Sequence, residues 1–236
     1  MCGLLGVHSA NAETVTIGAE DDWYPYSRVQ NGQPKGMAVD LVREAFGSVG
    51  IDVQFQSLPY SRCLALARMG SVAGCFDTAR NTRLEPQYLW PFQPLFTARV
   101  QIFGRADVSQ RNLQLKDLEG REVGVTAAYE YGEAFDSNPR VRRVVSDRDL
   151  QSFRKLLNGK VEFVVIYEKV ANHLLEKHAH EFKGRIKPVG EVGETGLYLA
   201  LSKTAPNARM TAEWFDRGLA TILRNGRYKA IEQSWK

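Results

Sequence analysis

The residues in this sequence best suited to chemistry are an arginine, a threonine and two aromatic side chains in its N-terminal half. Arg83 lies five residues after Thr78, and Trp23 and Tyr60 stand in short turn-like segments that contain proline. A guanidinium group offers a planar pair of donors that matches a carboxylate. A flat aromatic ring covers the apolar part of a small molecule or attracts a cation. Together these residues indicate non-covalent binding of a small anionic or zwitterionic molecule.

The same residues also have structural interpretations. Arg83 could be a surface arginine at the start of a helix, with Arg62 or Arg80 in its place at the site. Trp23 and Tyr60 could be packing residues, which is the commoner role of any one aromatic side chain. Their turn positions beside polar residues favour the binding interpretation.

Composition and charge exclude several classes of protein. The 236 residues carry a formal net charge of +4, with 44% hydrophobic and 25% charged residues, which is ordinary for a globular chain of one or two domains. No apolar stretch approaches the ~20 residues that span a bilayer. The densest basic cluster, 140–143, has no interleaved aromatic residues, so we expect a solvated face and no nucleic-acid partner. We expect no metal or cofactor, because the clustered histidines fit a surface helix end: His173, His178 and His180.

The N-terminus predicts export. Residues 1–12 resemble the tail of a signal peptide that ends in Ala-x-Ala, so the mature chain would begin near Glu13 and work in the periplasm. The alternative is a disordered tail with a chance match. Export into an oxidising compartment would allow a disulfide between Cys63 and Cys75, although two buried free thiols are nearly as consistent with the sequence.

Hydrophobic periodicity predicts two successive α/β sets. The first set alternates strands and helices, which implies a parallel sheet with helices on both faces: strands 14–18, 52–57 and 72–76, helices 37–49 and 61–69. The second set follows a strand at 99–103: a turn and then a strand within 118–125, strands 141–145 and 161–166, and helices 129–135, 149–157 and 168–175. A glycine-rich passage at 190–195 is expected to be flexible. A strand at 197–201 and helices at 208–223 and 226–235 complete the chain, so the chain crosses between the sets twice.

The whole mature chain resembles the periplasmic solute-binding proteins of ABC importers, in the branch of polar amino-acid binders known as family 3. The matching pieces, in order, are Trp23-Tyr24-Pro25-Tyr26, Gly36-x-x-x-Asp40-Leu41, Leu66-x-x-x-Gly70, Thr78-x-x-x-x-Arg83, Trp90-Pro91-Phe92-x-Pro94-Leu95-Phe96, Asp117-Leu118-x-Gly120-x-x-Val123-Gly124-Val125, Leu157-x-Gly159-x-x-Glu162 and Asn225-Gly226-x-Tyr228-x-x-Ile231-x-x-x-Trp235. Each piece alone is weak, but eight in the correct order point to one fold.

The resemblance implies an α/β, two-lobed periplasmic-binding-protein fold of type II, with a mainly parallel sheet and flanking helices in each lobe. Two hinge strands would join lobe 1, residues 13–100 and 194–236, to lobe 2, residues 101–193. A monomer would close its lobes over a small-molecule ligand and dock on an ABC permease in the inner membrane.

For the site, the resemblance implies that Thr78 and Arg83 hold a ligand carboxylate between the rings of Trp23 and Tyr60. The second lobe departs from the pattern, because Tyr167 stands where the family has an ammonium-binding aspartate. Two alternatives remain open. An acid takes the ammonium group, the candidates being Glu20, Asp21, Asp22, Glu130 and Glu168; or Tyr129 and Tyr167 form a neutral wall for another ligand.

The functional expectation is capture of a small carboxylate-bearing solute, an amino acid or a related compound, for an ABC transporter, without catalysis. One alternative is a periplasmic dehydratase-like enzyme of the same fold, with Glu130 or Glu168 as its acid or base. The other is the ligand-binding subunit of a sensory system.

Overall fold

The computed structural model describes residues 13–235, so the predicted signal-peptide remnant lies outside the described residues. The strands are β1 (Thr14–Glu20), β2 (Asp22–Trp23), β3 (Ser27–Gln30), β4 (Gln33–Lys35), β5 (Asp52–Leu58), β6 (Gly74–Ala79), β7 (Phe96–Arg105), β8 (Glu122–Thr126), β9 (Arg142–Ser146), β10 (Phe163–Tyr167) and β11 (Ile186–Leu201). The helices are α1 (Met37–Gly47), α2 (Tyr60–Met69), α3 (Glu133–Asp136), α4 (Asp149–Leu157), α5 (Glu168–Lys177), α6 (Ala179–Phe182), α7 (Ala208–Arg224) and α8 (Arg227–Ser234). Two 3-10 turns lie at Glu85–Gln87 and Leu115–Leu118.

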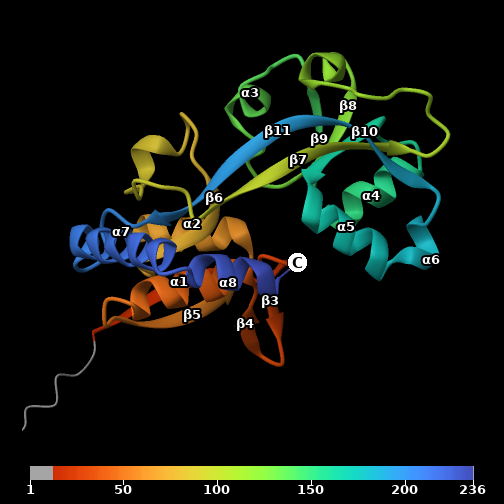
Figure 1. Ribbon diagram of the computed structural model, residues 1–236. Helices are drawn as coiled ribbons and strands as arrows, with labels where there is room; N and C mark the ends of the chain where they lie inside the picture. The colour runs from red at the N-terminus through yellow and green to blue at the C-terminus, as the bar shows by residue number, and fades with distance from the viewer. Residues whose placement is uncertain (1–12, 236) are drawn as a thin grey trace, which may run out of the picture.

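One eight-stranded sheet runs through the molecule in the order β5-β1-β6-β11-β7-β10-β8-β9. The pairs β1–β5, β1–β6, β8–β9 and β8–β10 are parallel, whereas β7 and β11 run antiparallel to each other along their length. Figure 1 shows β7 and β11 side by side, passing from the body that holds α1, α2, α7 and α8 to the body that holds α4, α5 and α6. The predicted α/β fold of two lobes joined by two strands is confirmed.

The predicted crossing points lie opposite each other in this ladder, since Val100 pairs with Gly193 and Arg99 with Glu194. We therefore use the name lobe 1 for β1–β6, α1, α2, α7 and α8, and the name lobe 2 for β8–β10 and α3–α6. The division at residues 100/101 and 193/194 remains our proposal.

The core of lobe 1 forms where the apolar face of α1 meets β5 and α7. Leu41, Val42 and Phe46 are fully buried, as the helical spacing of apolar residues predicts. The α1–α7 contact depends on Gly218, because a Cβ atom there would lie 2.0 Å from the carbonyl oxygen of Ala45. This packing holds α7 and α8, the last helices of the chain, in the same lobe as β1, its first strand.

The glycine-rich passage at 190–195 is the main correction to the sequence prediction. It belongs to β11 and pairs with β7, with register shifts at Pro188/Gly190 and Glu191/Gly193. Gly193 has a φ of 140°, and a Cβ on Gly190 would lie 2.1 Å from the carbonyl oxygen of Leu113. The glycines therefore permit bulges and a close backbone approach within a paired strand.

The predicted helix at 129–135 is also wrong in extent. Only Glu133–Asp136 is helical, and Gly132 precedes it with a φ of 101°. Residues before Gly132 form an irregular loop after β8, which leaves Tyr129 and Glu130 free to point toward lobe 1. This loop supplies part of the cleft described below.

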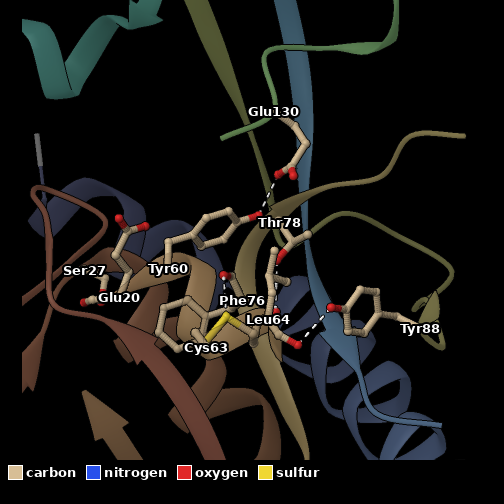
Figure 2. Close-up of a disulfide and its surroundings, with 10 residues drawn as sticks. Glu20, Ser27, Tyr60, Cys63, Leu64, Phe76, Thr78, Tyr88 and Glu130 are labelled. Atoms are coloured by element: carbon tan, nitrogen blue, oxygen red, sulfur yellow. Dashed lines mark hydrogen bonds between the residues drawn. A yellow bond between two sulfur atoms is a disulfide. The ribbon is translucent and has the colours of Figure 1, made fainter. Parts of the chain in front are cut away.

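Cys63 of α2 and Cys75 of β6 form a disulfide with a Cα–Cα distance of 5.8 Å. Figure 2 shows it beneath the ring of Tyr60. The structure thus adopts the first of the two states that the sequence left open. Within residues 13–235, no helix is long and apolar enough to cross a membrane, and no group of three or more His, Cys, Asp or Glu residues could hold a metal ion.

Candidate ligand-binding site

A small cavity lies between the lobes at the carboxyl ends of their strands, where open α/β sheets bind ligands. Lobe 1 contributes the end of β1, the strand β2, a residue near the end of β6, and the first residue of α2. Lobe 2 contributes the loop after β8 and the end of β10. The lining residues are Glu20, Trp23, Tyr60, Asp77, Tyr129, Glu130 and Tyr167. The free space measures about 10 Å³, enough for the centre of one water molecule. A ligand must therefore enter with the lobes parted.

Hydrogen bonds between tyrosines and glutamates close the cavity. The hydroxyl of Tyr129 donates to the carboxylate of Glu20, and that of Tyr60 donates to Glu130 Oε2 at 2.6 Å. Both bonds join lobe 1 to lobe 2, and Figure 2 shows the Tyr60–Glu130 bond reaching across the cleft. Within lobe 2, the hydroxyl of Tyr167 donates to the backbone carbonyl of Glu130 at 2.7 Å. These bonds fix the tyrosine rings around the cavity.

Asp77 owes its position to an irregularity in β6. Thr78 pairs with Tyr198 and Cys75 with Ala200, so two residues of β6 oppose the single Leu199 of β11. Asp77 has a φ of 65°, in the left-handed region that costs most non-glycine residues energy. A bulge of this kind redirects a side chain. Here the side chain of Asp77 lines the cavity, and no group within residues 13–235 hydrogen-bonds to either of its carboxyl oxygens.

Burial raises the pKa of every carboxyl group in the cavity. The pKa of Asp77 lies well above its usual range for this reason alone. The pKa of Glu20 is likewise raised by burial, against the lowering effect of its bond from Tyr129, and the nearby Asp77 raises it further. Burial raises the pKa of Glu130 to about 8, against the lowering effects of Tyr60 and Arg83. The cavity therefore favours either bound protons or a cation.

The aromatic side chains meet nearly at right angles. The ring of Trp23 lies 5.0 Å from that of Tyr167 and 6.0 Å from that of Tyr129, at interplanar angles of 86° and 78°. Tyr60 meets Tyr129 at 5.3 Å and 88°. The indole Nε1 of Trp23 is buried without a hydrogen-bond partner within residues 13–235. We call Trp23, Tyr60, Tyr129 and Tyr167 the aromatic wall.

Three predicted site residues lie outside the cavity. The side chain of Arg83 is 62% exposed, and its Nη2 donates to Glu130 Oε1 at 2.8 Å. Thr78 is fully buried and donates to the backbone carbonyl of Cys75 at 3.2 Å, while Arg62 is exposed. The structure thus brings together five of the predicted residues, namely Glu20, Trp23, Tyr60, Tyr129 and Tyr167, whose contact with a ligand remains a proposal.

Two acids complete the site beyond the residues selected from the sequence. Asp77 was missed, although an aspartate beside Thr78 inside an apolar strand is a usable signal. Glu130 was considered only as one of several alternatives. Another alternative, Glu168, lies outside the cavity, accepting a hydrogen bond from Gln101 at 2.8 Å and lying 3.7 Å from Arg99.

A cleft between two lobes, with side chains from both lobes and a pair of connecting strands, defines a two-lobed ligand-binding protein. The sequence profile of the bacterial extracellular solute-binding proteins, family 3, matches residues 15–236. The chain belongs to that family. No curated protein matches the sequence.

Solved structures share the fold over nearly the whole chain. A histidine kinase sensor domain with similarity to periplasmic binding proteins has a TM-score of 0.81 and 22% identity, covering 94% of this chain and 95% of that chain. The arginine-, lysine-, histidine-binding protein ArtJ from Geobacillus stearothermophilus has a TM-score of 0.77 and 19% identity, covering 94% and 95%. The ancestral amino acid-binding protein AncCDT-1, a precursor of cyclohexadienyl dehydratase, has a TM-score of 0.75 and 18% identity, covering 94% of each chain. At these identities the similarity establishes the fold.

Proposed function

We propose that this chain is a periplasmic, monomeric binding protein that captures a small charged solute between its lobes and delivers it to an ABC permease. The observation that carries the proposal is the convergence of seven side chains from both lobes on one cavity beside the connecting strands. Family membership and the similarity to ArtJ support it. No catalytic step is part of this function.

Closure would be held by polar contacts between the lobes as well as by the ligand. At one side of the cleft, Arg148 donates to both carboxyl oxygens of Asp21 at 2.8 and 3.3 Å. At the other side, the backbone N–H and the hydroxyl of Thr82 donate to Glu133 at 2.8 Å. Contacts on both sides give the closed state a defined geometry, which a permease could recognise.

The test has two stages. Calorimetry against amines, amino acids and dicarboxylates should find at least one ligand, and small-angle scattering should show a smaller radius of gyration when that ligand binds. Reconstitution with a candidate permease should then show ligand-dependent stimulation of ATP hydrolysis. A folded protein that binds no member of the panel would overturn the proposed function.

A second candidate is the ligand-binding subunit of a sensory system, favoured by the similarity to a histidine kinase sensor domain. Its cleft chemistry would be the same, so only the partner separates the two functions. Ligand-dependent binding to a receptor ectodomain, without stimulation of any permease, would establish it.

A further inference from the structure

The charge of the cavity is one-sided. Three of its seven lining residues are acidic and none is basic. Glu20 and Glu130 are each 3% exposed, and Asp77 is 5% exposed. Each ionised carboxylate held away from water needs an opposite charge or several donors. The side chains that line the cavity supply hydroxyl donors to Glu20 and Glu130 but no positive charge.

Asp77 is the group left without a partner. Both of its carboxyl oxygens are buried and accept no hydrogen bond from residues 13–235, in a structure that places this side chain through a strand bulge and a left-handed backbone. Backbone conformations of this kind persist where the surrounding structure over-determines them, and they gather at functional sites. A buried acid aimed into a ligand cavity without a donor is suited to a cation that arrives with the ligand.

The aromatic wall suits the same kind of group. A cation can bind over the electron-rich face of a Trp or Tyr ring, and proteins use groups of such rings to hold ammonium groups. The ring of Trp23 is within 5.0 Å of Tyr167 and 6.0 Å of Tyr129. Such a wall stabilises organic cations and offers little to a free carboxylate.

The group expected to hold a ligand carboxylate is already occupied. The guanidinium of Arg83 donates to Glu130 Oε1 at 2.8 Å, and the hydroxyl of Tyr60 donates to Oε2 of the same carboxylate at 2.6 Å. The carboxyl group of Glu130 thus accepts the hydrogen bonds that the arginine and one tyrosine of the cleft could otherwise offer to a ligand. A ligand therefore does not need to bring a carboxylate.

We propose that the solute captured in this cleft is an amine or guanidine without a carboxylate, whose cationic group contacts the Asp77 carboxylate inside the aromatic wall. The inference rests on the proposed binding function and names the class of solute. In this arrangement Glu20 shares the positive charge with Asp77, and Glu130 closes the cleft as an internal partner of Arg83.

Agmatine and arginine form a matched pair of probes, because agmatine is arginine without its carboxylate. We expect calorimetry of protein unfolded and refolded to remove bound ligand to show agmatine or 1,4-diaminobutane binding about tenfold or more tightly than arginine. The reason is that the carboxylate of arginine would enter a cavity lined by three acids and no basic side chain. Glutarate, a dianion, should not bind. Tighter binding of arginine or glutarate would overturn the inference and leave the proposed function standing. If none of these probes binds, the result would count against both the inference and the proposed function.

The variant Asp77→Asn keeps the side-chain shape and tolerates a left-handed backbone. It should weaken agmatine binding by about 30-fold or more, as expected for removal of one partner of a buried charge pair. Asp52→Asn, an exposed change on β5, is the matched control and should leave the affinity unchanged. If Asp77→Asn does not fold, Glu20→Gln gives a second test with the same expected direction. Unchanged affinity in a folded Asp77→Asn variant would show that Asp77 is a neutral buried acid, and would overturn the inference.

Discussion

Loss of the disulfide between Cys63 and Cys75 should lower both the stability of lobe 1 and the affinity of the site. Both cysteines are fully buried, and the Sγ atom of Cys63 lies 2.5 Å from the position of a Cβ on Gly18. The bridge ties the start of α2, which carries Tyr60, to the part of β6 that carries Asp77. It therefore connects two walls of the cavity directly.

The stability lost without the disulfide can be worked out from the length of the loop that the bridge closes. Cys63 and Cys75 are separated by 12 positions. In the chain-entropy account, closing such a loop removes freedom from the unfolded chain worth about 3 kcal/mol at 25 °C. For a chain of this size that corresponds to a fall of about 6–12 °C in Tm.

Urea unfolding with and without reductant measures this difference in one and the same protein. A Cys2→Ser background leaves this pair as the chain's only cysteines. Mass spectrometry after alkylation checks that the oxidised sample holds the bridge and the reduced sample does not. Agmatine affinity, measured in Cys63→Ala/Cys75→Ala, should fall as well, because Tyr60 and Asp77 lose their covalent connection.

Two results would refute this reasoning. Oxidised and reduced samples that unfold at the same urea concentration would show that loop closure contributes nothing measurable. Free thiols in protein folded under oxidising conditions would show that the bridge does not form.

Three further predictions concern single positions. The pKa of Glu130 is about 8 in the folded state against an ordinary 4.5, so the folded protein retains a proton that the unfolded chain releases. The free energy of unfolding should therefore fall as pH rises from about 5 to 8, with a slope of up to about 1.4 kcal/mol per pH unit. Glu130→Gln should remove this pH dependence from a series of urea unfolding curves, and equal slopes in both proteins would contradict the prediction. Gly218→Ala places a methyl group against the backbone of Ala45 and should lower the free energy of unfolding by about 1–3 kcal/mol. Its control, Gly47→Ala, lies at a helical site with nothing within 4 Å and should raise the free energy of unfolding by about 0.5–1 kcal/mol. Thermal unfolding of both variants tests the two opposite signs. Tyr167→Phe leaves the buried carbonyl of Glu130 without its donor and should cost about 1–3 kcal/mol, and an unchanged Tm would argue against that bond.

Much of the fold could be predicted because the local pattern of apolar and polar residues indicates where helices and strands form. The helix Asp149–Leu157 was predicted to the residue, and α1 begins at Met37 as expected, since the periodicity of apolar residues reports which face is buried. Glycine misled the prediction at 190–195, because the same residue type marks flexible loops and bulged strands. Strand pairing decides between these, and pairing involves β7, which is remote in sequence.

The candidate site, like the fold, was predictable from the sequence only in part. The sequence by itself determined the family and the fold, because ordered motifs are local properties of the chain. It selected Trp23 and Tyr60 from their turn positions, and offered Tyr129 and Tyr167 only as one of two alternatives. Only the tertiary structure decided the charge of the cavity. Arg83 meets Glu130, 47 residues away, only because the two lobes meet. Asp77 reaches the cavity only because β6 carries two residues opposite Leu199. Contacts between distant segments thus decided which acids line the cavity and paired Arg83 with Glu130.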